Sequence, residues 1–336
     1  MERKTVVIDF SLLTPIFTKF VAEPLFKFVP WWLPANIITI ISNLCIVLAM
    51  VIAILVKTGV FKFWQIVPLL IIFYLTGDIF DGKQARRTKT CSKLGEFLDH
   101  FFDIFVVGFL VSIIFIIYEI IDPLSIAIFL SISFLPFFGF YYEQYKRRTL
   151  FFEKLGAFEG VSTFILFIVL GFIEPTRLFL TNTTIFNFPL VFILFVLLCL
   201  AAVYSTKRNL DRIGTKGNRG FLVYLFLNAI TVFFASHLLP SAAIMFVIAA
   251  YCGGFIGRLH IAYLLEHKEP IPDFIFPLFL AVAFFVKMPE PAILTISIVY
   301  QVVNVLLSFL SGFIPLRKHW VWINPEESEY LDVYTV

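Results

Sequence analysis

The sequence predicts an all-α integral membrane protein that crosses the bilayer about ten times. Hydrophobic residues make up 60% of the 336-residue chain, charged residues make up only 15%, and the mean hydropathy is +0.95. A soluble domain usually contains about 25% charged residues, and here the apolar excess extends along the whole chain. The net charge of +3 is too small to indicate a nucleic-acid partner.

Ten apolar stretches approach the length of about 20 residues that a helix needs to cross a bilayer. The expected spans are residues 35–56, 63–85, 95–118, 124–145, 157–173, 186–205, 220–238, 241–263, 272–287 and 291–314. Before them, residues 9–33 mix apolar with charged residues and end in Pro30-Trp31-Trp32. This composition favours an amphipathic helix at the membrane interface over a loosely ordered N-terminal arm.

The positive charges fall mainly on one side of these spans. If the N-terminus is cytoplasmic, all but four of the 26 Lys and Arg residues are cytoplasmic, and the exceptions are Lys57, Lys62, Arg177 and Lys287. Cytoplasmic loops of membrane proteins carry an excess of Lys and Arg. The pattern therefore supports about ten spans with both termini in the cytoplasm.

Two pairs of aspartates flank the short connection between the second and third spans. Asp78 and Asp81 are three residues apart, so they lie on one helix face. Asp99 and Asp103 are four residues apart and also share a face. The short connection makes the helices antiparallel neighbours, so the four carboxylates can converge near the cytoplasmic membrane edge. Because such anions need neutralisation, we predict two hard divalent cations that clamp a diphosphate.

Small residues and an arginine accompany the acidic pairs. Gly82 allows the backbone to approach a ligand closely, Ala85 is also small, and the planar fork of Arg86 suits a phosphate. Helix-end carboxylates can also arise as ion-pair partners of nearby Lys and Arg. That alternative explains one or two acids, but it fits four at these spacings poorly.

The whole pattern resembles the signature of the CDP-alcohol phosphotransferase family. It reads Asp78-x-x-Asp81-Gly82-x-x-Ala85-Arg86, then eight residues, then Gly95-x-x-x-Asp99-x-x-x-Asp103. The resemblance implies that the four aspartates hold two Mg²⁺ or Mn²⁺ ions. It also implies a substrate site for CDP, made by Asp78, Gly82, Ala85, Arg86 and Gly95, with Gly95 allowing close helix packing.

Further segments resemble the choline and ethanolamine phosphotransferase branch of that family. They are Asp81-Gly82-Lys83-Gln84-Ala85-Arg86-Arg87-Thr88, Leu94-Gly95-Glu96-x-x-Asp99-His100 and Leu33-Pro34-Ala35-Asn36-Ile37-Ile38-Thr39. The chain departs from the branch at Ala35, which separates Pro34 from Asn36, and at Phe101-Phe102, which replaces a usual Gly-Cys pair. The branch resemblance implies transfer of phosphocholine or phosphoethanolamine from a CDP-alcohol to diacylglycerol, with release of CMP. It also implies a homodimer.

The resemblance leaves the identity of the general base open. It implies that His100 takes the proton of the attacking hydroxyl with help from Glu159, and histidine titrates near neutral pH. Asp103 competes for this role, because many relatives lack the histidine. Glu159 also fits a helix N-terminus, which favours an anion. Asn36 fits both a cap of the first span and, by resemblance, a position near the nucleotide.

A second group of polar residues lies at the end of the eighth span and just after it. Arg258 and His260 end that span, and Glu266, His267 and Glu269 follow it. A metal site can be drawn from them, but the pattern favours a solvated cytoplasmic loop.

These observations predict an N-terminal interfacial segment over 1–34, a catalytic core over 35–206, four further spans over 207–316 and a cytoplasmic tail over 317–336. The active site is expected at the cytoplasmic face, in the endoplasmic reticulum or Golgi of a eukaryote or the inner membrane of a bacterium.

One alternative function is a phosphatidyltransferase that uses CDP-diacylglycerol and a soluble alcohol such as inositol or glycerol phosphate. The Asp99-His100 pair argues against it. Another is a cation transporter, which would place carboxylates at mid-membrane on several distant spans.

Overall fold

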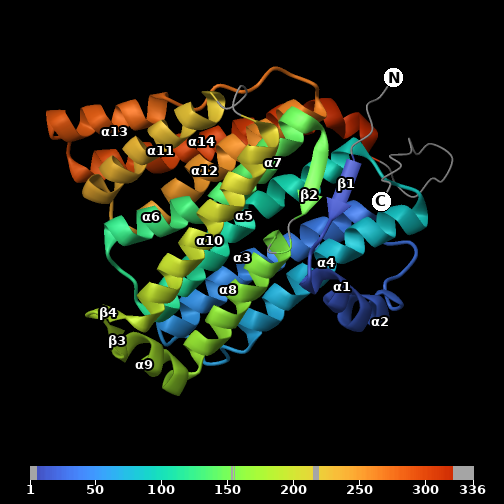
Figure 1. The fold of residues 1–336 in the computed structure, drawn as a ribbon, viewed down its shortest axis with the longest axis horizontal. Coiled ribbons are helices and arrows are strands. Elements are labelled where there is room, and N and C mark those ends of the chain that lie inside the picture. Colours follow the sequence, from blue (N-terminus) through green and yellow to red (C-terminus); the bar gives the residue numbers. More distant parts are fainter. Residues whose placement is uncertain (1–5, 153, 155, 215–218, 321–336) are drawn as a thin grey trace.

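The fold is almost entirely helical in the computed structural model, which describes residues 6–152, 154, 156–214 and 219–320 (Figure 1). The N-terminal arm contains the strand β1 (Val6–Asp9), the helix α1 (Leu13–Phe17), a π-helical turn (Thr18–Ala22) and the helix α2 (Glu23–Phe26). The helix expected in this arm is therefore present over 13–26. Its position at a membrane interface stays a prediction, and Phe20, Phe28 and Trp32 are exposed as that position requires.

Helices form at every expected span. They are α3 (Ala35–Lys57), α4 (Ile66–Thr88), α5 (Lys93–Tyr118), α6 (Pro123–Ser133), α7 (Leu135–Arg147), α8 (Ala157–Phe172), α9 (Glu174–Asn182), α10 (Leu190–Ile213), α11 (Arg219–Leu238), α12 (Ser241–Leu264), α13 (Ile275–Val286) and α14 (Glu290–Leu316). A 3₁₀ turn (Arg317–His319) follows α14. The chain is thus an all-α, multi-pass membrane protein.

The number of spans differs from the sequence prediction. Among the described residues, seven helical segments are long and apolar enough to cross a membrane, with α6 and α7 counted as one, or eight if the bent pair α8 and α9 is added. The helix α4 stands outside this set and carries five charged residues between Asp78 and Arg87. The helix α13 has only 12 residues. The count of ten is therefore not confirmed.

Short strands and a sharp bend interrupt the helices. The strand β2 (Thr149–Phe152) pairs in parallel with β1, with Val6 opposite Thr149. The antiparallel hairpin of β3 (Thr184–Ile185) and β4 (Phe188–Pro189) turns at Phe186 and Asn187, both at positive φ. The axes of α8 and α9 differ by 101°, and Pro175 in the first turn of α9 cannot continue the hydrogen bonding of α8.

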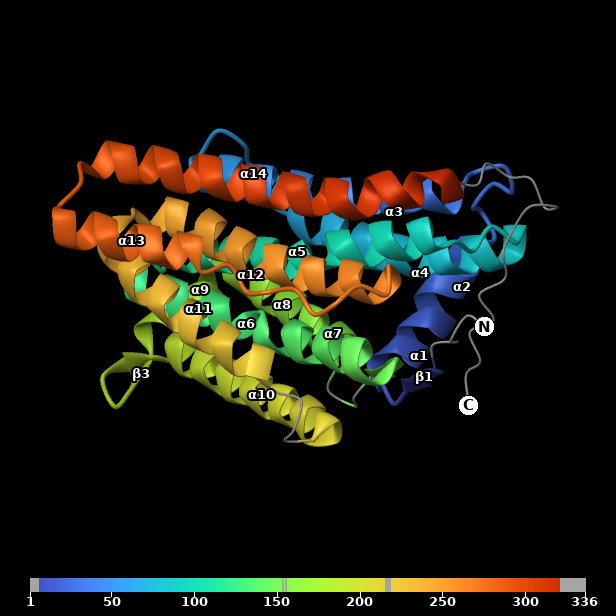
Figure 2. The same ribbon diagram turned by 90° about the horizontal axis from the view of Figure 1, so that it is seen from above.

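One apolar core joins the early and late helices. The helix α3 packs against α4 and α5, while α12 packs against α5, α6, α7 and α14. Figure 2 shows α5 and α12 between α14 on one side and α10 on the other. Because α12 lies against α5, residues from the second half of the chain reach the helix that carries Asp99 and Asp103.

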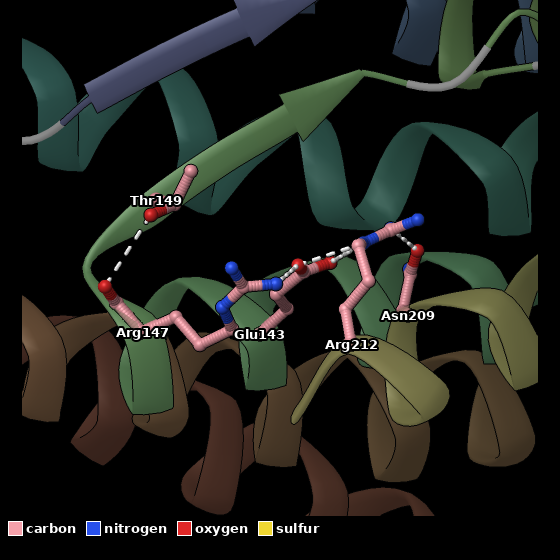
Figure 3. A network of polar contacts seen from close by, with 5 residues as sticks. All are labelled: Glu143, Arg147, Thr149, Asn209 and Arg212. Carbon is pink, nitrogen blue, oxygen red and sulfur yellow. Dashed lines mark hydrogen bonds and ion pairs between the residues drawn. The ribbon is translucent and has the colours of Figure 1, made fainter. Parts of the chain in front are cut away.

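A buried ion-pair network fastens β2 to this core (Figure 3). The Glu143 carboxylate on α7 is 1% exposed. Its Oε1 accepts hydrogen bonds from Arg212 Nε at 2.8 Å and from Arg147 Nη1 at 3.1 Å, and its Oε2 accepts one from Arg212 Nη2 at 2.8 Å. The Arg212 guanidinium lies 4.1 Å from the ring centroid of Phe151 in β2. A buried carboxylate is tolerated when cations and hydrogen bonds satisfy it, so this network holds α7, α10 and β2 together.

Candidate active site

The two acidic helices are positioned by their ends and by α3. The helix α4 ends where Lys89 adopts a left-handed conformation, and α5 begins where the Ser92 hydroxyl accepts a hydrogen bond from the Gly95 backbone N–H at 3.1 Å. At Gly77, α3 approaches so closely that an added Cβ would lie 2.5 Å from the Ser42 Cβ. This contact fixes the spacing between α3 and the helix turn that carries Asp78.

Three of the four predicted aspartates converge. Carboxylate oxygens of Asp78, Asp99 and Asp103 all lie within 4.8 Å of one another. Asp81 is outside this group, is 5% exposed, and accepts a 2.6 Å hydrogen bond from the Thr39 hydroxyl. Within the described part of the chain, the buried Oδ1 of Asp99 has no hydrogen-bond partner. A cluster of carboxylates in which one buried oxygen receives no hydrogen bond is a suitable binding site for a hard divalent cation.

Two neighbouring hydroxyl groups orient the carboxylates. The Tyr74 hydroxyl, one helical turn before Asp78, donates to Asp103 Oδ1 at 2.8 Å and so joins α4 to α5. Thr39 on α3 plays the equivalent part for Asp81. Such outer contacts fix the direction of a ligand's lone pairs. Neither Thr39 nor Tyr74 was predicted as a site residue, although the i, i+4 spacing of Tyr74 and Asp78 places both on one face of α4.

The small residues of the signature lie at close contacts. A Cβ at Gly82 would lie 3.5 Å from both terminal nitrogens of Arg86, so these two residues form one surface. A Cβ at Gly95 would lie 3.1 Å from Asn36 Oδ1, so α3 meets α5 there. Ala85 is half-buried on the same helix as Arg86, which is exposed. Arg86 is thus free to reach a ligand outside the helix bundle.

Asn36 does not cap the first span. The helix begins at Ala35 and its N-cap residue is Pro34, so Asn36 occupies the second helical position. Its side chain is 9% exposed and faces Gly95. The capping alternative is therefore wrong, because the helix starts two residues earlier than a cap at Asn36 requires.

The N-terminal arm is fastened beside these residues. The Gln84 amide donates to the carbonyl oxygens of Pro30, Trp31 and Leu33 at 2.6 to 3.2 Å. The Arg87 guanidinium lies 4.5 Å from the ring centroid of Phe26. Because an α-helix has 3.6 residues per turn, Gln84 and Arg87 lie on the opposite face of α4 from Asp78, Gly82 and Ala85. The arm therefore packs against the back of the helix that carries the signature.

His100 lies beside the acidic group and against a second histidine. Its Nε2 is 3.8 Å from Asp99 Oδ2, and its ring centroid is 4.9 Å from that of His260 on α12. His260 is 0% exposed. The expectation of a solvated loop is wrong for His260, because α12 continues to Leu264 and packs this residue against α5. Further along, Glu269 forms an ion pair with Lys146 at 2.6 Å.

Glu159 occupies the start of α8, as expected, and binds the N-terminal arm. Its Oε1 accepts hydrogen bonds from the Ser11 hydroxyl at 2.7 Å and from the backbone N–H groups of Leu12 and Leu13 at 2.8 and 3.0 Å. Its Oε2 accepts from the Gly156 N–H at 2.9 Å. The carboxylate thus joins two helix N-termini. Its assistance to a base stays a prediction.

Comparison with known proteins places the signature in a family. The sequence model of the CDP-alcohol phosphatidyltransferase family matches residues 32–251. Choline/ethanolaminephosphotransferase 1 of Arabidopsis thaliana is 31% identical over 164 residues, which are 45% of this chain and 39% of that protein. An uncharacterized CDP-alcohol phosphatidyltransferase class-I family protein 2 of Dictyostelium discoideum is 30% identical over 199 residues, covering 55% of this chain and 48% of the relative.

A shorter match is closer in sequence. Cholinephosphotransferase 1 of Mus musculus is 37% identical over 81 residues, which are 23% of this chain and 20% of that protein. In each of these three comparisons the chain therefore aligns with less than half the length of the relative.

Proposed function

The chain belongs to the CDP-alcohol phosphatidyltransferase family, and we propose that it transfers phosphocholine or phosphoethanolamine from a CDP-alcohol to diacylglycerol, releasing CMP. The observation that carries this proposal is the convergence of Asp78, Asp99 and Asp103 between α4 and α5, with His100 beside Asp99. The names of the Arabidopsis and mouse relatives support the choice of head group.

In the proposed site, Asp78, Asp81, Asp99 and Asp103 hold two Mg²⁺ or Mn²⁺ ions. Bound divalent cations would neutralise the diphosphate and stabilise the negative charge that develops as CMP leaves the β-phosphorus. Thr39 and Tyr74 keep the carboxylates oriented before substrate arrives. The Arg86 guanidinium binds a phosphate oxygen, and Gly82 and Ala85 leave room for the nucleotide. Asn36 and Gly95 shape the wall where α3 meets α5.

The proposed reaction is an in-line displacement. The hydroxyl oxygen of diacylglycerol attacks the β-phosphorus, the bond from that phosphorus to the bridging oxygen breaks, and CMP leaves with the electron pair. His100 takes the hydroxyl proton, and Asp103 is the alternative base. Glu159 is proposed to assist by keeping the N-terminal arm in place through its hydrogen bonds to Ser11 and the arm backbone.

The positive charge distribution supports a site at the cytoplasmic face, where a water-soluble nucleotide enters while the lipid enters from the bilayer. We further propose a homodimer and a division of the chain into a segment over 1–34, a catalytic core over 35–206, further helices over 207–316 and a tail over 317–336. The mass of the purified detergent complex by light scattering tests the dimer.

The deciding experiment uses purified protein, Mg²⁺, and a panel of CDP-alcohols and lipid acceptors. We expect CMP release from CDP-choline or CDP-ethanolamine only when diacylglycerol is present. Activity only with CDP-diacylglycerol and inositol or glycerol phosphate would overturn the proposed substrates. For the base, His100→Ala should lower kcat at neutral pH by roughly 10²–10⁴-fold. An unchanged rate would assign the role to Asp103.

A further inference from the structure

A second metal-ligating group lies next to the aspartates and has a different chemistry. Glu96 and His100 are four residues apart on α5, and His260 enters from α12. One ligand atom from each of the three residues lies within 4.8 Å of the other two. Ligand atoms around a tetrahedral Zn²⁺ are about 3.4 Å apart, given bonds of about 2.0–2.1 Å. The distances between the three ligand atoms therefore need to shorten by little more than about 1 Å for Zn²⁺ to bind.

One ring nitrogen of each histidine in this group lacks a hydrogen-bond partner. Among the described residues, His100 Nδ1 and His260 Nε2 are buried and accept or donate no hydrogen bond. His260 Nδ1 lies 3.4 Å from Gln144 Oε1. Since an amide oxygen only accepts, this contact requires the tautomer with the proton on Nδ1, and in that tautomer Nε2 keeps its lone pair. This arrangement matches metal-ligating histidines, whose second nitrogen donates to an oxygen outside the site.

The surroundings of the group favour a desolvated ion. The Tyr141 ring centroid lies 5.2 Å from that of His260 and 5.9 Å from that of His100. His260 is 0% exposed, and α12 is among the most enclosed spans. Buried polar atoms without partners are costly, so two unpartnered ring nitrogens beside a carboxylate point to a ligand that accepts their lone pairs.

We propose that Glu96, His100 and His260 form a binding site for a transition-metal dication of the Zn²⁺ class, distinct from the aspartate site. Two imidazoles and one carboxylate suit Zn²⁺, and three protein ligands leave a fourth position for water. Mg²⁺ prefers carboxylate and water oxygens, so it selects the aspartates instead. The two neighbouring sites thus differ in the metal that each prefers.

If the proposed function is correct, Zn²⁺ bound at this site inhibits the transfer reaction. A Zn²⁺ ion bound to His100 uses the lone pair that would accept the proton of the attacking hydroxyl. The ion therefore inhibits transfer, and removal of His260 or Glu96 weakens that inhibition. Binding itself does not depend on the reaction.

The test is Zn²⁺ binding to purified full-length protein in detergent, after chelation and in excess Mg²⁺ to fill the aspartate site. Bound zinc is measured by equilibrium dialysis and elemental analysis, without substrates. We expect wild type to bind one Zn²⁺ per chain. Because loss of even an outer contact typically weakens metal binding 10–100-fold, His260→Ala and Glu96→Gln should each weaken it by roughly that factor or more. The exposed His237 on α11 supplies the matched control, and His237→Ala should bind as wild type does.

A second measurement needs no variant, since His260 is fully buried and its replacement can impair folding. Co²⁺ added to Mg²⁺-saturated wild type should give the visible absorption of a four- or five-coordinate ion, and Zn²⁺ should remove it. Absence of this absorption, or equal zinc affinity in wild type, Glu96→Gln and His260→Ala, would overturn the proposal. Because no substrate is present, this outcome is independent of the substrate panel above.

Discussion

Replacement of Gly77 by alanine tests whether the α3–α4 spacing controls the acidic site. The added Cβ would lie 2.5 Å from the Ser42 Cβ, whereas carbon atoms in good contact are about 3.5–4.0 Å apart. The two helices must therefore separate locally by about 1 Å or more. The shift acts on the turn that carries Asp78 and on the helix whose Thr39 holds Asp81.

The expected effect combines a stability cost with a larger loss of rate. Overpacking of this kind destabilises a protein by about 1–3 kcal/mol. A displacement of about 1 Å at a catalytic site can lower the rate about 10²-fold. CMP release by Gly77→Ala should therefore fall by roughly 10²-fold in protein that still elutes as a single folded species and melts cooperatively.

A compensating substitution separates this effect from general damage. Ser42→Gly removes the atom that clashes, so Gly77→Ala with Ser42→Gly should regain most of the rate. Ser42→Gly alone should cost only about 0.5 kcal/mol of helix stability. Gly160→Ala is the matched control, because no atom lies within 4 Å of its added Cβ. Full activity of Gly77→Ala, or no recovery in the double variant, would refute the reasoning.

Two further substitutions probe the outer contacts of the site and the core. Thr39→Val removes the hydroxyl that donates to Asp81. It should raise the Mg²⁺ concentration for half-maximal CMP release by about 10–100-fold. An unchanged Mg²⁺ titration would show that this contact is dispensable. Arg212→Leu leaves the buried Glu143 carboxylate short of a cation and should destabilise the fold by about 3–5 kcal/mol, seen as a lower melting temperature. The exposed Lys207→Leu on the same helix should change stability by at most about 0.5 kcal/mol, and equal melting of both variants would contradict the assigned role of the network.

The two acidic pairs could be predicted because each depends only on the spacing of residues within one helix. Residues three or four apart share a helix face, so Asp99 and Asp103 follow directly from spacing. Each predicted apolar stretch likewise corresponds to a helix, whereas α9 (Glu174–Asn182) lies between two of the predicted stretches. Their count as spans was less predictable, because α4 combines a span's length with many charges and α13 is short.

Contacts between segments that are far apart in the sequence could not be predicted from local spacing. His260 lies 160 positions after His100. The predicted span over 241–263 contains it, but the sequence does not show that this span packs against the helix that carries His100. Glu159 accepts hydrogen bonds from the Ser11 hydroxyl and from neighbouring backbone N–H groups. Every residue except proline has a backbone N–H, so such donors cannot be recognised from the sequence. The parallel pairing of β1 with β2 also joins segments more than 140 residues apart.

The most direct test of the central proposal is removal and return of divalent metal during transfer. Purified protein is assayed for CMP and phospholipid formation from CDP-choline or CDP-ethanolamine and diacylglycerol, first with EDTA and then with added Mg²⁺ or Mn²⁺. The aspartate site predicts that product formation stops in EDTA, returns with either ion, and stays absent in Asp103→Asn at any Mg²⁺ concentration. Full transfer in EDTA would contradict it.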